Sequence, residues 1–302
     1  MVKHLEKTYC KLELKTSKVL EYCGLTFDYS EDGCVKIGAA SYIEEAVEDF
    51  PEEVSGKSRT PAARHIFEVD PEGVRLDEDR RKVFHSTFAK LLWVGRKARP
   101  DTLVALSFLG KRTECADEDD WKKLKRLLCY LKGTIDLRLT LSVESMNVVK
   151  WYADSSFAVH GDMKSHSGTF ATLGKGAIYA TSGAQKLNTT SSTECEVVAA
   201  AGVLPQALWT ASFLKHQGYD VDKTVLHQDN KAAILLQENG VLSRGKKSRH
   251  VDIKYFFIKD RIEKGDIEIE FCGTDDMIAD YMTKPLQGQL FYKFREAIMG
   301  MR

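Results

Sequence analysis

The fold is decided by a carboxylate-bearing stretch in the middle of the chain, Trp151-Tyr152-Ala153-Asp154-Ser155-Ser156. The residues leading into it (VVKWYA, 148–153) are mostly β-branched or aromatic and predict a strand that Asp154 closes. Further strands are expected at 168–173, 177–181, 224–228 and 266–272, and helices at 192–216, 229–237, 248–262 and from near Asp275. Three antiparallel strands followed by alternating helices and strands predict a mixed α/β sheet covered by helices.

Four carboxylates lie where such a sheet places reactive groups, at strand ends and in the first turns of helices. They are Asp154, Glu196, Asp229 and Asp280. Each alone also fits a helix cap, a turn residue or a surface charge. No His or Cys lies near enough in sequence to form a zinc motif, and carboxylates alone favour Mg²⁺ or Mn²⁺. Two such ions about 4 Å apart suit the hydrolysis of phosphodiesters.

The charge of the chain is balanced, with 44 Lys and Arg against 44 Asp and Glu over 302 residues. Neutrality argues against nucleic-acid binding as a property of the whole chain. Two windows, 81–112 and 244–264, nevertheless contain eight basic residues each and few acids. They predict local basic surfaces hidden within a neutral total.

The first 140 residues are expected to be mainly helical, with a short hairpin at 25–35 that turns at Asp32-Gly33. Helices are predicted at 42–50, 83–98 and 117–131. In the last of these, an apolar stripe opposes the basic side chains of Lys122, Lys123, Lys125 and Arg126. That basic face is either simply solvated or in contact with phosphates.

The apolar run 197–214 is about as long as the roughly 18 residues that a membrane-spanning helix needs. Pro205, the many alanines and the adjoining Glu196 favour a buried core helix, and no membrane partner is expected. The seven cysteines are scattered without close pairs, which is typical of reduced thiols in an intracellular protein. We therefore expect a cytoplasmic (virus-like particle) or nuclear location rather than secretion.

Successive blocks of the C-terminal half resemble the ribonuclease H domain that ends the Pol polyprotein of copia-type LTR retrotransposons. These blocks are WYADSSFAVHGDMKSHSG, SSTECEVVAA, QDNKAAILL, RHVDIKYFFIKDRI and MIADYMTKPLQG. Upstream, YCGLTFDYSEDG, YIEEAVEDF, FHSTFAKLLWVGRKARPD and DEDDWKKLKRLLCYLKGT are similar to the segment that joins the reverse transcriptase palm to that domain. The resemblance covers nearly everything from about Tyr22 onward. It implies the end of a palm plus a thumb-like segment at 1–143, and a ribonuclease H-like domain with a mixed five-stranded sheet at 148–302.

The resemblance also implies roles for particular residues. The family's metal-binding carboxylates fall on Asp154, Glu196, Asp229 and Asp280, with Glu194 as a rival for the second place. Glu196 is preferred because it directly precedes the apolar run, and residues two apart on a helix point in nearly opposite directions. The residues expected to contact nucleic acid are Ser192, Thr193, Asn188, Gln185, Asn230, Arg249, His250, Lys122, Lys123 and Arg126.

Two departures from the family pattern bear on activity. The loop 272–275 contains no histidine to shuttle protons, so we expect modest turnover; His250 is the nearest alternative by sequence. No YxDD motif is present, so we expect the fingers and most of the palm to lie before residue 1 and no polymerase activity from this chain alone.

The function implied is Mg²⁺-dependent endonucleolytic cleavage of the RNA strand of RNA/DNA hybrids, with two metal ions and Mn²⁺ as a substitute. The partners implied are the hybrid and the remainder of the reverse transcriptase. The alternatives are a silent remnant that binds nucleic acid without cutting it, or a fragment that is classed only as a reverse transcriptase.

Overall fold

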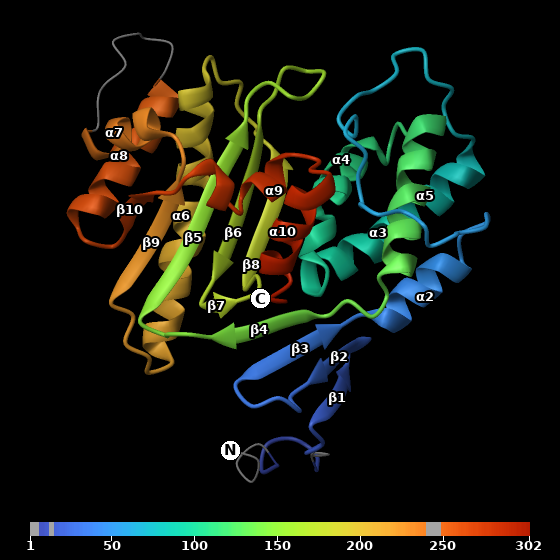
Figure 1. Cartoon of the computed structure of the whole chain (residues 1–302), viewed down its shortest axis with the longest axis horizontal. Coiled ribbons are helices and arrows are strands. Elements are labelled where there is room, and N and C mark those ends of the chain that lie inside the picture. Colours follow the sequence, from blue (N-terminus) through green and yellow to red (C-terminus); the bar gives the residue numbers. More distant parts are fainter. Residues whose placement is uncertain (1–5, 12–14, 240–248) are drawn as a thin grey trace.

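The computed structural model describes residues 6–11, 15–239 and 249–302, and it contains two five-stranded sheets in these ranges (Figure 1). The larger sheet has the order β10 (Glu268–Phe271), β9 (Lys223–Gln228), β5 (Val148–Ser156), β6 (His166–Thr172) and β8 (Tyr179–Ala184). The β5, β6 and β8 strands are antiparallel neighbours, whereas β9 pairs in parallel with both β5 and β10. This is the ribonuclease H-like mixed sheet that the sequence predicts.

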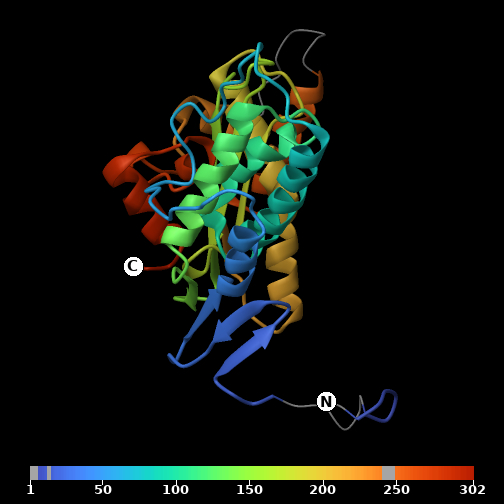
Figure 2. The same ribbon diagram turned by 90° about the vertical axis from the view of Figure 1, so that its right-hand side faces the viewer.

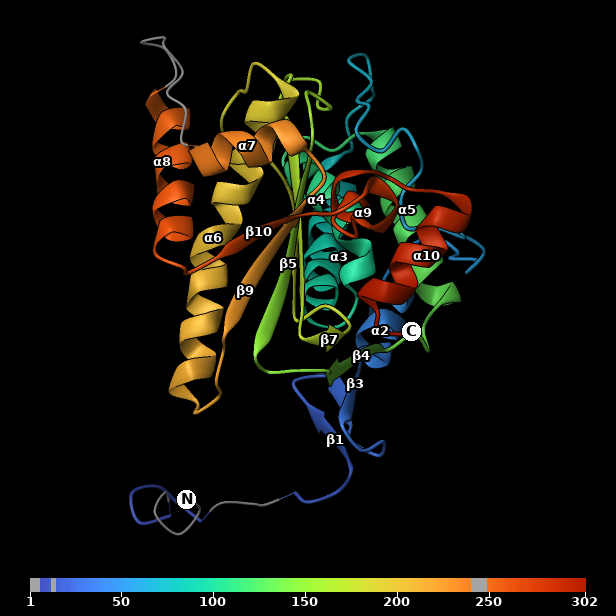
Figure 3. The same cartoon turned by 60° about the vertical axis from the view of Figure 1, so that its left-hand side comes forward.

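The period of two along β5 directs alternate side chains to opposite faces of this sheet. Val149, Trp151 and Ala153 point to one face and are buried in a core with α6 (Ser192–His216). Figure 3 shows α6, α7 (Lys231–Asn239) and α8 (Arg249–Glu263) on this side of the sheet. The α6 helix is long and apolar enough to cross a membrane by composition, but half of its most apolar window is buried inside the protein. Its buried side chains form part of the core, as the sequence predicts, whereas Trp209 and Phe213 near its end are exposed.

The opposite face of the sheet packs against helices from both ends of the chain. Phe170 of β6 shares one core with α3 (Glu78–Lys97), α4 (Leu103–Arg112), α9 (Asp280–Thr283) and α10 (Gly288–Ile298). The α2 (Ala40–Glu48) and α5 (Glu118–Gly133) helices extend the same core, and the short η1 (Pro100–Thr102) links α3 to α4. The amino-terminal helices therefore complete the core on this face of the sheet.

The second sheet corrects the expectation of an isolated hairpin. The predicted hairpin exists as β2 (Leu25–Asp28) and β3 (Cys34–Gly38), but it continues into the antiparallel order β1-β2-β3-β4-β7. The added strands are β1 (Val19–Tyr22), β4 (Leu139–Val143) and β7 (Gly174–Lys175). Figure 2 shows β1, β2 and β3, in blue, extending below the helices. Because β7 follows β6 in the chain, this sheet connects the two parts of the sequence.

The carboxyl end of the chain is fastened to the same sheet. The Thr140 amide donates to the Met299 carbonyl oxygen at 2.9 Å, and Gly300 follows with a φ of +69°. A Cβ at Gly300 would collide with the Thr140 carbonyl oxygen, so both the positive φ and the close approach require glycine. This contact fixes the end of α10 beside β4.

Candidate metal centre

The predicted carboxylates converge at one end of the larger sheet. Asp154 lies within β5, which runs two residues further than the sequence predicts, and Asp229 directly follows the neighbouring β9. Glu196 lies in the second turn of α6, which packs on β5. One carboxylate oxygen from each of the three lies within 4.8 Å of the others.

The fourth predicted carboxylate adjoins this trio through a lysine. Asp280 is the first residue of α9 and is 4% exposed. The Lys284 ammonium lies 2.6 Å from Asp280 Oδ1 and 4.0 Å from Asp154 Oδ2. The structure thus brings together all four predicted carboxylates, and it adds a lysine that the sequence analysis missed although it lies one helical turn after Asp280.

Hydroxyl groups hold the carboxylates of the trio. Ser155 donates to Glu196 Oε1 from its hydroxyl at 2.8 Å and from its amide at 3.3 Å. The Thr283 hydroxyl donates to Asp154 Oδ2, and the Thr274 hydroxyl donates to Asp229 Oδ2 at 3.4 Å. Thr274 belongs to the loop in which the sequence lacks a histidine. These donors orient the carboxylates but bring no positive charge.

A buried oxygen of Glu196 has no hydrogen-bond donor in the part of the chain that the structure describes. Glu196 is 5% exposed, and its Oε2 is buried without a hydrogen-bond partner among the described residues. A buried carboxylate oxygen without a partner carries a desolvation penalty that a bound cation would remove. Oxygen-only ligands and an unpartnered buried oxygen fit a hard divalent cation, and the fit by itself does not distinguish Mg²⁺ from Mn²⁺.

The electrostatics of the cluster point the same way. Burial, reinforced by the nearby Asp154, raises the pKa of Glu196 to about 9. Burial and the neighbouring Asp280 raise the pKa of Asp154 to about 6, although Lys284 opposes the shift. Burial also raises the pKa of Asp229. Without a cation, the cluster is short of positive charge.

Glu194 and Glu196 have different surroundings. The Oε2 of Glu194 accepts from the amide and hydroxyl of Thr190 at 2.7 and 2.8 Å. Glu196 points toward Asp154 and Asp229. Glu196 is therefore the member of the cluster, as the helical spacing predicts.

Several residues predicted to contact nucleic acid lie close to this cluster in the chain. Ser192 and Asn188 are exposed, Thr193 is partly exposed, and both Ser192 and Thr193 lie in the first turn of α6. Asn230 lines the same pocket as the trio, and its Oδ1 accepts from the Ala233 amide at the start of α7.

Gln185 differs from the other residues predicted near α6 to contact nucleic acid, because it is buried and its amide nitrogen is already engaged. It is 5% exposed, and its Nε2 donates to Ser167 Oγ and to the Cys195 carbonyl oxygen, both at 2.8 Å. These bonds tie the end of β8 to α6, so Gln185 supports the fold beneath the cluster. Burial of this kind depends on tertiary packing, which the motif does not report.

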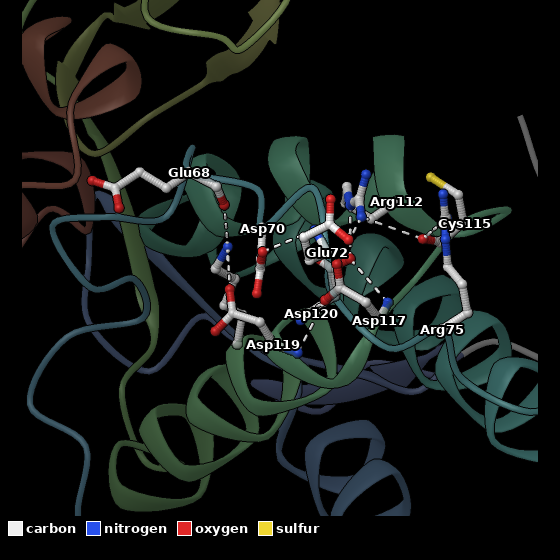
Figure 4. A network of polar contacts seen from close by, with 10 residues as sticks. Glu68, Asp70, Glu72, Arg75, Arg112, Cys115, Asp117, Asp119 and Asp120 are labelled. Carbon is white, nitrogen blue, oxygen red and sulfur yellow. Dashed lines mark hydrogen bonds and ion pairs between the residues drawn. The ribbon is translucent and has the colours of Figure 1, made fainter.

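The basic face of α5 is only partly accessible to the phosphates of a nucleic acid. Lys122 is exposed, and Arg126 is half-buried with Nη2 donating to Thr60 Oγ1. Lys123 is 5% exposed, and its ammonium contacts the Glu68 carbonyl oxygen and the Asp119 carboxylate at 2.6 and 2.8 Å. Figure 4 shows Glu68 and Asp119 in this network. The prediction that Lys123 contacts phosphate is therefore wrong, because the loop carrying Glu68 covers it.

Two further predicted contacts, Arg249 and His250, begin α8, but their side chains lie outside the described residues. The prediction that they contact nucleic acid therefore stays a prediction.

The amino-acid sequence of the chain is similar to parts of several retrotransposon polyproteins. No family model matches the chain. The chain is 28% identical over 267 residues to the retrovirus-related Pol polyprotein from transposon TNT 1-94 of Nicotiana tabacum, covering 86% of this chain and 20% of that protein. It is 30% identical over 207 residues to the corresponding polyprotein from transposon RE2 of Arabidopsis thaliana, covering 66% of this chain and 14% of that protein. The chain thus spans a fifth or less of the length of these relatives.

Among solved structures, LC11-RNase H1 in complex with RNA/DNA hybrid is 17% identical, with a TM-score of 0.32 over 44% of this chain and 92% of that one. Over most of its length the chain is therefore similar to a part of the Pol polyproteins of copia-type retrotransposons.

Proposed function

We propose that the chain is a ribonuclease H-type endonuclease that uses Mg²⁺ to hydrolyse the RNA strand of RNA/DNA hybrids. The observation that carries the proposal is the convergence of Asp154, Glu196 and Asp229 within 4.8 Å, with an unpartnered buried oxygen on Glu196. The ribonuclease H-like sheet beneath them and the relation to Pol polyproteins agree with this activity. Residues 148–302 would form the nuclease, and residues 1–143 would be the end of a palm with a thumb-like part.

In this proposal the four carboxylates hold two divalent ions, which when bound would activate water and stabilise the leaving 3′ oxygen. The residues of the chain position the carboxylates and bind the nucleic acid. Ser155 and Thr283 fix the carboxylates of Glu196 and Asp154 through their hydroxyls. Ser192, Thr193 and Asn188 offer hydroxyl and amide groups to phosphates and 2′-hydroxyls at the amino end of α6, where the helix dipole favours an anion.

The test is cleavage of a hybrid with labelled RNA by the purified chain, in Mg²⁺ and in EDTA. We expect cleavage in Mg²⁺ only, and little cleavage of RNA/RNA or DNA/DNA duplexes. Asp154→Asn should lower cleavage by about a thousandfold or more, which exceeds 4 kcal/mol of barrier, while hybrid binding persists. Asp162→Asn is the matched control, since Asp162 lies exposed in the loop after β5 and pairs with Lys164.

Each other outcome has a defined meaning. Undiminished cleavage by Asp154→Asn would refute the assignment of the site. Binding of the hybrid without any cleavage in Mg²⁺ would support the alternative of a silent nucleic-acid-binding remnant. Primer extension by the chain alone would contradict the expectation that it has no polymerase activity.

A further inference from the structure

The four carboxylates are not equivalent, because a cation of the protein already contacts part of the cluster. Asp154, Glu196 and Asp229 converge on one another, whereas Asp280 is engaged by Lys284. The Lys284 ammonium also faces Asp154 Oδ2 at 4.0 Å. The lysine therefore lies on the Asp154–Asp280 side of the cluster and leaves the Glu196 oxygen without a partner.

This contact differs from an ordinary surface ion pair. Asp154 and Asp280 are 2% and 4% exposed, so their charges are largely removed from water. A nearby ammonium is worth more to such groups than to exposed ones, since solvent screens it less. Lys231, the other lysine of this pocket, instead places its ammonium 4.6 Å from the centre of the Phe271 ring.

The position of Lys284 conflicts with a metal ion at the same oxygen. Mg²⁺ binds carboxylate oxygens at about 2.0–2.1 Å and requires near-octahedral surroundings. An ammonium 2.6 Å from Asp280 Oδ1 occupies space and charge that such an ion needs. The Lys284 side chain is 42% exposed and has four methylene groups, so it can withdraw toward solvent when an ion arrives.

We propose that Lys284 is a positioning residue that stands in for a metal ion between Asp154 and Asp280 and must be displaced when that ion binds. Lys284 then lowers the metal affinity of this side of the cluster and leaves the side of Glu196 and Asp229 nearly unaffected. Two ions would bind in order, the Glu196 side first. This inference rests on the proposed function, because it assumes that the carboxylates bind two ions.

The experiment is a titration of the full chain with Mn²⁺ in the absence of nucleic acid. Binding is measured by calorimetry and by the electron paramagnetic resonance signal of free Mn²⁺. The wild type should show a tighter and a weaker step. Lys284→Met should tighten the weaker step about tenfold, or about 1.4 kcal/mol, and change the tighter step by less than about threefold. Lys284→Arg, which keeps the charge, should behave as the wild type.

Lys231→Met is the matched control, because it removes a lysine of the same pocket that contacts no carboxylate of the cluster. It should change either step by less than about threefold. The melting temperature of metal-free Lys284→Met should fall because Asp154 and Asp280 lose their counter-ion. A lysine with a purely structural role would also lower the melting temperature, but it would not tighten metal binding. Lys284→Gln provides the same comparison if the Met variant does not fold.

The outcomes separate this inference from the proposed function. Unchanged or weaker Mn²⁺ binding by Lys284→Met, or equal tightening by Lys231→Met, overturns the role of Lys284 while hybrid cleavage by the wild type stands. A wild type that binds no Mn²⁺ and cleaves no hybrid overturns the proposed function, and this inference with it.

Discussion

Arg99 and Asp101 between α3 and α4 are as deeply buried as the carboxylates at the end of β5, but their charges are matched. Arg99 donates to Asp101 through Nε and Nη2 at 2.9 and 2.8 Å, and to Thr134 through two further bonds. The Tyr130 hydroxyl also donates to Asp101 at 2.6 Å. At the candidate metal centre, hydroxyl groups donate to the three carboxylates, and the Lys284 ammonium faces Asp154 alone among them in the described structure.

The difference separates buried charge that stabilises the fold from buried charge that is kept for a ligand. The ion pair with Asp101 raises the pKa of Arg99 against the effect of burial, so the guanidinium stays charged. Burial instead raises the pKa of Glu196 and so favours its neutral, protonated form. The first region therefore gains nothing from an added cation, whereas the second is stabilised by one.

The largest effect on stability is expected at the buried ion pair of Arg99 and Asp101. Asp101→Ala should lower the free energy of unfolding by about 3–5 kcal/mol, since it leaves Arg99 buried without its partner. Thermal unfolding should register a drop of about 10 °C, with or without Mg²⁺. Glu31→Ala, which removes an exposed partner of Lys36, should leave the midpoint unchanged. A small effect of Asp101→Ala would show that this region tolerates an unmatched charge.

At the metal centre, by contrast, removing a buried charge should raise the stability of the metal-free protein. Glu196→Gln replaces an acid that burial destabilises in its charged form, so the variant should be more stable in EDTA. At pH 8 we expect a gain of about 2 kcal/mol, or roughly 5 °C in the melting temperature. The variant should also lose the stabilisation that Mg²⁺ gives to the wild type. A variant that melts lower than the wild type in EDTA would contradict the electrostatic account of this site.

The dependence of stability on pH should differ between metal-free and metal-bound protein. Glu196 has a raised pKa, so the folded protein binds a proton that the unfolded chain has released between about pH 4.5 and 9. Stability in EDTA should therefore fall as pH rises through this window, by up to about 1.4 kcal/mol per pH unit. Saturating Mg²⁺ should flatten the slope, because it binds the deprotonated cluster. Unfolding in guanidinium chloride from pH 6 to 8 measures both slopes.

The comparison also shows which features can be predicted from sequence. The positions of the five strands of the larger sheet along the chain and the bounds of α6 follow from hydrophobic periodicity and local composition, whereas the order of the strands in the sheet does not. The site carboxylates follow from their resemblance to the family blocks. The β1 and β7 strands could not be predicted, because four- and two-residue segments have no distinct period. The β7 strand is in addition fixed by β4, which lies far from it in the sequence.

The contacts of individual side chains were the other feature that the sequence could not predict. The sequence pattern assigns Lys123 to the basic face of α5, but the loop that carries Glu68, 55 residues earlier, covers it. Lys284 was missed because an (i, i+4) lysine after an aspartate is typical of any exposed helix. Its importance depends on Asp154, which lies on β5. Both cases depend on contacts between elements far apart in the chain.

The smallest expected effect tests whether the fold beside the metal centre can be weakened without changing the centre. Ser191 caps α6, and its hydroxyl accepts from the Glu194 amide at 3.2 Å. Ser191→Ala should cost about 1 kcal/mol of stability through the lost cap, or about 2–4 °C in melting temperature. Mn²⁺ affinity should not change, because Glu196 is held by Ser155 from β5 rather than by the cap. A parallel loss of Mn²⁺ affinity would show that the amino end of α6, and not β5, sets the position of Glu196.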